Sequence, residues 1–287
     1  MATTLEDTLE ILALARSTNK VIQVGFVLRY APFYTKIKNL VDEGALGKIL
    51  MIQMNERLTL HLGSVFKRSW HRLEKYTGGF MNEKCSHDLD LMCWIKERQS
   101  TPVAISSFGG ISFDTERETA LVCKECDLSC PWRYRNSRSG KMLNGKPCVD
   151  DTYAEIDRCV FHSDSDVCDQ QSVSILFKDG TQGVFTTLSM SGIPGRDITV
   201  HGTDGCLQGC LETGEIVVHN YWEGTTQNIS LGKTDSHGGA DRFIVESFLN
   251  CITEGIQPIS TVEAGVRAST IAFAADQSMK EQRKIVL

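Results

Sequence analysis

Three side chains that could move a proton lie within one short stretch of the sequence. Glu83 and His87 are four residues apart, and His87 and Asp90 are three apart. On a helix these spacings place all three side chains on one face. A carboxylate beside an imidazole orients the ring and raises its basicity, which prepares it to accept a proton. Gly78 and Gly79 come just before this stretch and would let a substrate approach the helix closely.

The same spacing also fits an ordinary solvent-exposed helix face, because structural ion pairs gather charged residues as well. The apolar residues that follow favour the functional interpretation. Leu91, Met92, Trp94 and Ile95 lie on the same predicted helix, so we expect it to be inserted into a core. The pattern predicts a helix from about Met81 to Ile95.

Hydrophobic periodicity predicts further helices toward both ends of the chain. Thr3 with Glu6, and Ser260 with Glu263, have the spacing of capping boxes, which satisfy the free amides at a helix start. A β-branched run over 21–27 predicts a buried strand, although no strand precedes it in this sequence to pair with it. The predicted helices cover residues 3–18, 32–44, 81–95, 241–253 and the segment from 260 onward.

The middle of the chain is predicted to be mainly extended. Residues 49–60 have the character of a strand, and alternating apolar residues flank a tight turn at Asp179 and Gly180. Residues 114–170 are rich in Cys, Asp, Arg and Ser without sustained periodicity, so we expect an irregular insertion there. Helices around a mainly β middle favour an α+β fold.

Composition argues against several classes of function. A chain of 287 residues can form one large domain or two small ones. Its formal net charge of -6 argues against binding to nucleic acid or to an anionic membrane. No run approaches the roughly 20 apolar residues that cross a bilayer, and the first residues do not resemble a signal peptide. Eleven cysteines, mostly isolated in apolar segments, favour a reducing, cytoplasmic compartment.

One cluster of cysteines has the spacing of metal ligands. Cys123, Cys126 and Cys130 form C-x2-C-x3-C, and Cys148 could supply a fourth ligand. A structural zinc site needs four soft ligands within tetrahedral reach, and no second C-x-x-C pair follows. The sequence therefore favours reduced cysteines packed in an irregular loop, and we predict no metal site.

Several stretches, in order along nearly the whole chain, resemble the Gfo/Idh/MocA oxidoreductases. That family includes glucose–fructose oxidoreductase and inositol dehydrogenases. The stretches are G-F-V-L-R-Y-A-P-F-Y (25–34), E-G-A-L-G-K-I (43–49), S-W-H-R (69–72), G-G-F-M-N-E-K-C-S-H-D-L-D (78–90), S-H-G-G-A-D-R-F (236–243) and T-V-E-A-G-V-R-A-S-T-I-A-F-A-A-D-Q-S (261–278).

The resemblance implies a Rossmann domain followed by an α+β domain, whose large, open, predominantly antiparallel sheet carries helices on one face. Residues 1–28 resemble the last helix and strand of a Rossmann domain. Residues 29–287 resemble the substrate-binding and oligomerisation domain, with the cysteine-rich insertion at about 114–170. The sequence contains no G-x-G tripeptide, and the family's Glu-Lys-Pro motif would end just before Met1. We therefore expect a chain that lacks most of its Rossmann domain and has no cofactor-binding residues of its own.

The resemblance also implies roles for particular residues. His87 would take the hydroxyl proton while hydride leaves the carbinol carbon for nicotinamide, and Glu83 would orient the imidazole or the substrate. Aspartate is the commoner carboxylate at that position in the family, so Glu83 is a departure. The residues that match positions near the sugar pocket are Arg29, Trp70, Asp90, His237 and Asp241.

Two functions of different class follow from this comparison. The first is the catalytic half of an NAD(P)-dependent oxidoreductase that acts on a sugar or cyclic polyol. NAD or NADP would bind in the full-length protein, and we expect none on this chain alone. The second is a truncated, non-catalytic homologue that serves as a binding or oligomerisation module with a full-length partner. In either case we expect a homo-oligomer that assembles through the sheet, and no nucleic-acid or membrane partner.

Overall fold

A single large sheet forms the centre of the molecule. The computed structural model describes residues 1–287 except 114–116, 135–141, 144–145, 148–156 and 234–236. Within the described residues, nine strands pair in the order β10-β9-β8-β7-β1-β6-β5-β2-β11. Strand β1 pairs parallel with β6 and antiparallel with β7, and the remaining described pairs in this sheet are antiparallel. The strands are β1 Ile49–Thr59, β2 Pro102–Gly110, β5 Gln170–Phe177, β6 Gln182–Ser191, β7 Gly195–Gly202, β8 Gly205–Cys210, β9 Glu215–Asn220, β10 Thr225–Ser230 and β11 Ile285–Val286.

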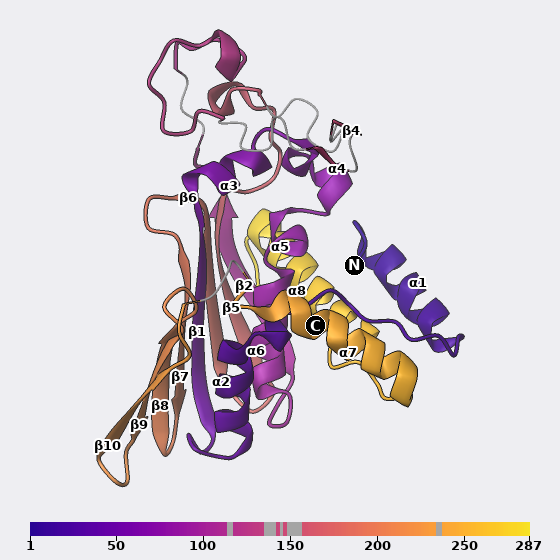
Figure 1. Ribbon diagram of the computed structural model, residues 1–287, viewed down its shortest axis with the longest axis vertical. Helices are drawn as coiled ribbons and strands as arrows, with labels where there is room; N and C mark the ends of the chain where they lie inside the picture. Colours follow the sequence, from indigo (N-terminus) through magenta and orange to yellow (C-terminus); the bar gives the residue numbers. More distant parts are fainter. Residues whose placement is uncertain (114–116, 135–141, 144–145, 148–156, 234–236) are drawn as a thin grey trace.

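Helices cover one face of this sheet (Figure 1). Helix α6 packs against β1, and α8 packs against β2 and α6. The opposite face exposes apolar side chains such as Leu50, Phe108 and Leu188. The predicted α+β fold with a large, mostly antiparallel sheet is therefore confirmed. The helices are α1 Leu5–Arg16, η1 Val27–Tyr30, α2 Pro32–Asp42, α3 Leu60–Phe66, η2 Trp70–Arg72, α4 Glu74–Thr77, α5 Phe80–Glu83, α6 Ser86–Lys96, η3 Cys123–Glu125, η5 Val160–His162, α7 Ala240–Glu254 and α8 Val262–Glu281.

Strand β1 lies in the middle of the sheet and turns alternate side chains toward the helices. Ile52, Met54 and Leu58 follow this alternation and are buried in the core. Glu56 occupies an inward position of the same pattern, so its carboxylate is almost completely buried. A buried carboxylate requires cationic or hydrogen-bonding partners, and these come from the site described below.

The predicted strand at 21–27 is wrong. Residues 21–26 form neither a helix nor a strand, and η1 begins at Val27. The amide of Val24 donates to the carbonyl of Ser260 (2.9 Å), and Phe26 packs against Ala264 and Ala268 of α8. The β-branched run is thus held by one backbone hydrogen bond and helix packing instead of a sheet.

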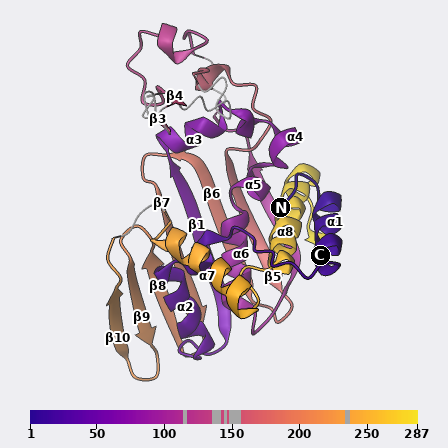
Figure 2. The ribbon, with the colours of Figure 1, turned by 45° about the vertical axis from the view of Figure 1, so that its right-hand side comes forward.

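The N-terminal helix and the C-terminal helix contact each other. Helix α1 packs on α8, with the linker after α1 leading toward α7 (Figure 2). Both helices begin one residue later than their predicted capping boxes, since Thr4 and Thr261 are the N-caps. In the part of the chain that the structure describes, no helix combines the length and apolarity needed to span a bilayer.

Helix α3 approaches β6 so closely that Gly63 has no room for a side chain. A Cβ at this position would overlap the carbonyl oxygen of Ser189. We expect Gly63→Ala to lower the free energy of unfolding by about 1–3 kcal/mol, because the backbone must shift. Gly110→Ala, where a Cβ meets nothing within 4 Å, should change it by less than about 0.5 kcal/mol. Urea denaturation of both variants measures the difference, and equal stabilities would contradict the close packing.

Candidate active site

A glycine pair introduces the segment that carries the predicted catalytic residues. Gly78 and Gly79 have φ of +70° and +94°, a region that favours glycine. A Cβ on Gly79 would overlap the carboxylate of Asp276 on α8. The pair therefore lets the chain turn tightly against α8, which is a packing role; the close approach of a substrate at these glycines stays a prediction.

The predicted single helix from Met81 to Ile95 is interrupted. Helix α5 ends at Glu83 and α6 begins at Ser86. The amides of Lys84 and Cys85 both donate to the carbonyl of Phe80, so the regular series of helical hydrogen bonds stops there. Because the helix is broken, the four-residue spacing of Glu83 and His87 does not place them one above the other.

The carboxylate of Glu83 pairs with a different histidine from the one that the sequence suggested. One carboxylate oxygen, Oε1, is hydrogen-bonded to Nδ1 of His71. The His71 ring in turn stacks on Trp70, with ring centroids 3.8 Å apart. The other oxygen of Glu83 is buried without a hydrogen-bond partner. The prediction that Glu83 orients the imidazole of His87 is therefore wrong in this structure, and the dyad is Glu83–His71.

His87 lies in the first turn of α6 and is partly buried. Its ring meets Phe26 edge-on, with centroids 5.6 Å apart. The Nδ1 atom is buried and has no hydrogen-bond partner among the described residues. Burial, together with the positive charges of Lys84 and Arg196, lowers the pKa of His87 to about 4. His87 is thus a neutral imidazole at physiological pH, and its Nδ1 is both buried and unpartnered among the described residues.

Next to His87, four charged side chains form a buried cluster between α6 and the sheet. Lys84 Nζ lies 2.7 Å from Glu56 Oε1, and Arg196 also pairs with that oxygen. Arg196 Nε donates to Asp88 Oδ1 at 3.1 Å. Glu56 and Asp88 are 2% and 0% exposed, whereas the side chains of Lys84 and Arg196 are 20% and 11% exposed. It links β1, β7, α6 and the junction between α5 and α6.

The pKa values of the two carboxyl groups in this cluster are shifted in opposite directions. Burial raises the pKa of Asp88 to about 7, and the negative charge of Glu56 adds to this effect while Arg196 opposes it. Burial acts on Glu56 in the same sense, but Lys84 and Arg196 outweigh it and lower the pKa of Glu56. At neutral pH Glu56 is therefore ionised, and Asp88 is close to half protonated.

Arg29 and Asp90, two predicted substrate residues, form a buried ion pair with each other. Arg29 donates to both Asp90 oxygens, at 2.6 and 2.7 Å, and to the carbonyl of Ile259 at 2.7 Å. The guanidinium also lies over the ring of Trp94. Both side chains are at most 3% exposed. The pair holds α6 against η1, and a substrate could reach neither residue without opening it.

The remaining predicted residues lie nearer the surface. His237 Nδ1 is 2.7 Å from Asp241 Oδ1 at the start of α7, and both side chains are exposed. The charge of His237 contributes to the lowered pKa of His87, which places His237 in its electrostatic neighbourhood. Trp70 is partly buried beneath its stacked neighbour His71. The structure therefore brings together His237 and His87, and separately Trp70, His71 and Glu83.

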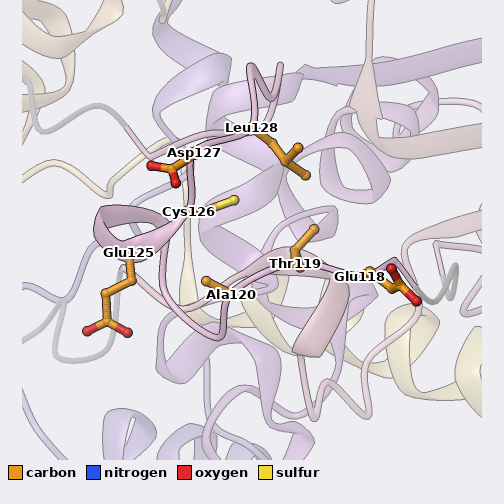
Figure 3. A pocket seen from close by; sticks show the side chains of 7 residues that line it. All are labelled: Glu118, Thr119, Ala120, Glu125, Cys126, Asp127 and Leu128. Atoms are coloured by element: carbon orange, nitrogen blue, oxygen red, sulfur yellow. The ribbon is translucent and has the colours of Figure 1, made fainter.

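Five of the cavities formed by described residues are lined by neither His87 nor Glu83. A cavity of about 410 Å³ lies between the end of α1 and the residues that join α7 to α8. Three others lie in the cysteine-rich insertion. In one of them, Figure 3 shows the Cys126 sulfur directed away from the carboxylate of Glu125.

The sequence profile of an oxidoreductase family, that of the Gfo/Idh/MocA C-terminal alpha/beta domain, matches residues 38–287. The chain belongs to this family. YteT of Bacillus subtilis (strain 168), a protein described provisionally as an oxidoreductase, is 23% identical over an alignment of 312 positions that covers 97% of this chain and 71% of YteT.

Solved structures of this family share the fold. Levoglucosan dehydrogenase in complex with NADH and levoglucosan matches with a TM-score of 0.73 at 16% identity, over 99% of this chain and 71% of that one. Aldose-aldose oxidoreductase from Caulobacter crescentus, complexed with glycerol, matches with a TM-score of 0.67 at 15% identity, over 100% and 70%. At these identities the likeness supports the fold of this Gfo/Idh/MocA member and no finer property.

The stability of variants at Arg29 and Asp90 tests whether these two residues have a structural role. We expect Asp90→Ala to lower the free energy of unfolding by about 3–5 kcal/mol, because it leaves the Arg29 guanidinium buried without a counter-ion. The double variant Arg29→Met with Asp90→Leu should recover most of that loss. Asp241→Ala, which breaks an exposed pair, should cost at most about 1 kcal/mol. Chemical denaturation at neutral pH measures all three, and a stable Asp90→Ala protein would contradict the structural role.

Proposed function

We propose that this Gfo/Idh/MocA chain supplies the substrate side of an NAD(P)-dependent oxidoreductase that oxidises a hydroxyl group of a sugar or cyclic polyol. His87 is the proton acceptor in this proposal. The observation that carries it is a neutral imidazole whose buried Nδ1 has no partner. It stands where the family motif has its histidine, after the glycine pair and before Asp90.

The surroundings of His87 hold the ring in the neutral form that can accept a proton. The low pKa keeps the ring unprotonated before substrate binds, although a general base works best when its pKa lies near the working pH. The nearby carboxylate of Glu56 acts in the opposite sense and favours the imidazolium once it forms. Of the charges around the ring, Lys84, Arg196 and His237 lower its pKa and Glu56 raises it.

Oxidation of an alcohol also removes a hydride from the carbinol carbon, and a bound nicotinamide would supply its acceptor. NADH is bound in the levoglucosan dehydrogenase complex. Residues 1–287 offer no glycine-rich turn of the kind that holds a dinucleotide's diphosphate. The proposal therefore assigns no residue of this chain to the cofactor and is confined to the hydroxyl proton.

A second candidate is a binding module that assembles with a full-length family member. The observation that favours it is an apolar, exposed face of α7, where Val245, Leu249 and Ile252 are each at least 53% exposed. A surface of this kind suits a protein partner. In this alternative His87 has no chemical role.

Substitution of His87 separates these two functions. In a preparation that reduces NAD(P)⁺ with a sugar or polyol, we expect His87→Ala to lower kcat by about 10²- to 10⁴-fold, the usual contribution of a general base. The control is His219→Ala, which removes an exposed histidine of β9 and should leave kcat unchanged. Unaltered turnover in His87→Ala, or no turnover with any polyol of a broad panel, would favour the binding module.

The pH dependence of kcat/KM tests the electrostatic account of His87. A base whose pKa is lowered to about 4 is active above that pH, so activity should fall only as the pH drops toward 4. Lys84→Met removes one charge that lowers this pKa, so the acid limb should move to higher pH. Lys178→Met, at an exposed lysine of the β5–β6 turn, is the control. An acid limb that is identical in both variants would show that His87 is not the titrating base.

A further inference from the structure

Four cysteines from two separate parts of the insertion line one small, enclosed cavity. They are Cys123, Cys126 and Cys130 of the C-x2-C-x3-C motif, together with Cys159. The cavity has a volume of about 20 Å³, which is room for one water molecule or one ion. The sequence alone had suggested Cys148 as the fourth cysteine, a residue that lies outside the described part of the chain.

Backbone pairing fixes Cys159 beside the motif. Val122 and Arg158 form an antiparallel bridge. The amide of Cys123 donates to Asp157 O and the amide of Cys159 donates to Leu121 O, both at 2.8 Å. The cysteines that follow the two bridge partners are therefore neighbours, although 36 positions separate them in the sequence.

Arg68 supplies the second observation, because it is a buried cation that lacks a carboxylate partner. Its side chain also lines the cavity and is 1% exposed. Its guanidinium donates to the Cys123 sulfur at 2.9 Å and to the carbonyls of Arg158 (2.6 Å) and Trp132. No carboxylate in the described part of the chain pairs with it. A buried charge needs compensation, and among the described groups that Arg68 contacts, the Cys123 sulfur is the one that could carry a negative charge.

Other donors also point at these sulfurs. The amide of Tyr134 donates to the Cys123 sulfur at 3.5 Å, and the hydroxyl of Thr119 lies 3.3 Å from the Cys159 sulfur. Metal-bound thiolates accept such hydrogen bonds from their surroundings. A disulfide would leave the cation at Arg68 uncompensated, since a disulfide carries no charge.

We propose that Cys123, Cys126, Cys130 and Cys159 bind one zinc ion as four thiolates. Zinc prefers a tetrahedral set of sulfur ligands in closed structural sites. Four thiolates around Zn²⁺ carry a net charge of about -2, and the guanidinium of Arg68 neutralises part of it. Among the described residues, no three His, Cys, Asp or Glu side chains are arranged so that they could hold a metal ion. Binding of zinc would therefore require the four sulfurs to move closer together.

The proposed site would fasten the insertion to the wall of the candidate active site. The described part of the insertion lies over α3 at one end of the sheet (Figure 1). Arg68 is two residues before Trp70, which stacks on His71 of the Glu83–His71 dyad. A metal at the four cysteines is thus structural and holds the insertion in place without entering the reaction.

The test is the zinc content of the whole chain, purified without chelator under reducing conditions. We expect about one zinc per chain by mass spectrometry of the metals. Ser substitutions at Cys123, Cys126, Cys130 or Cys159 should each reduce the bound zinc at least several-fold. Cys206→Ser, on β8 and outside the insertion, is the matched control and should retain it. Arg68→Met should weaken zinc binding by about 10- to 100-fold, the usual effect of losing a residue that supports metal ligands.

Two measurements on the unaltered chain keep the proposal testable if a variant does not fold. Cobalt added to the metal-free chain should give the absorption bands of a tetrahedral thiolate site. Removal of zinc by a chelator should expose the insertion to trypsin while the sheet stays intact. The proposal is overturned by a chain without zinc and with all thiols free. It is also overturned by a disulfide among these four cysteines, or by zinc that depends on Cys148 and not on Cys159.

Discussion

The buried charge cluster of Glu56, Lys84, Asp88 and Arg196 is the constraint on which the arrangement of the site depends. Each of these groups would be costly to bury alone, because charge loses its hydration in the protein interior. Together they satisfy one another and tie the central strand β1 and strand β7 to α6. The helix is interrupted between α5 and α6 in the same stretch, and Lys84 at this interruption forms an ion pair with Glu56. The low pKa of the His87 ring follows first from its burial and then from the positive charges of Lys84 and Arg196 in this cluster.

The second buried pair, Arg29–Asp90, changes how the resemblance to sugar-binding relatives should be interpreted. Both residues match positions near the family's sugar pocket, yet here each satisfies the other inside the core. Sequence motifs of a family record residues that hold the site together as well as residues that touch substrate. In this chain Asp90, the last residue of the motif, belongs to the first kind. His87, with an unpartnered nitrogen, is the residue that fits the second kind.

Glu83 pairs with His71 and not with His87, and this pairing affects the proposed chemistry. A carboxylate that holds His71 against Trp70 positions a second imidazole in the same region of the chain as His87. The site thus contains one oriented histidine and one histidine that lacks an orienting carboxylate. Proton transfer assigned to His87 therefore depends on its environment of burial and charge and not on a dyad with Glu83.

The sequence by itself determined the elements and the family. Periodicity, turn residues and ordered motifs were enough for the α+β class, for a helix that carries His87, and for membership of the Gfo/Idh/MocA oxidoreductases. Helix starts were one residue early at Thr3 and Ser260, because the following residue in each case is also a threonine that can cap. These are local properties, and local side chains decide them.

Only the tertiary structure decided which side chains meet. Spacing of three or four residues predicts neighbours only while a helix is continuous, and the break after Glu83 removed that premise. Arg196 and Glu56 come from strands far away in the sequence, so no local pattern could show that they surround Lys84 and Asp88. Cys159 joins the cysteine motif for the same reason, through a backbone bridge between segments that are distant in sequence. The partners of buried charges and sulfurs are the groups that the tertiary fold places next to them. The packing of the sheet and its helices therefore decides these contacts.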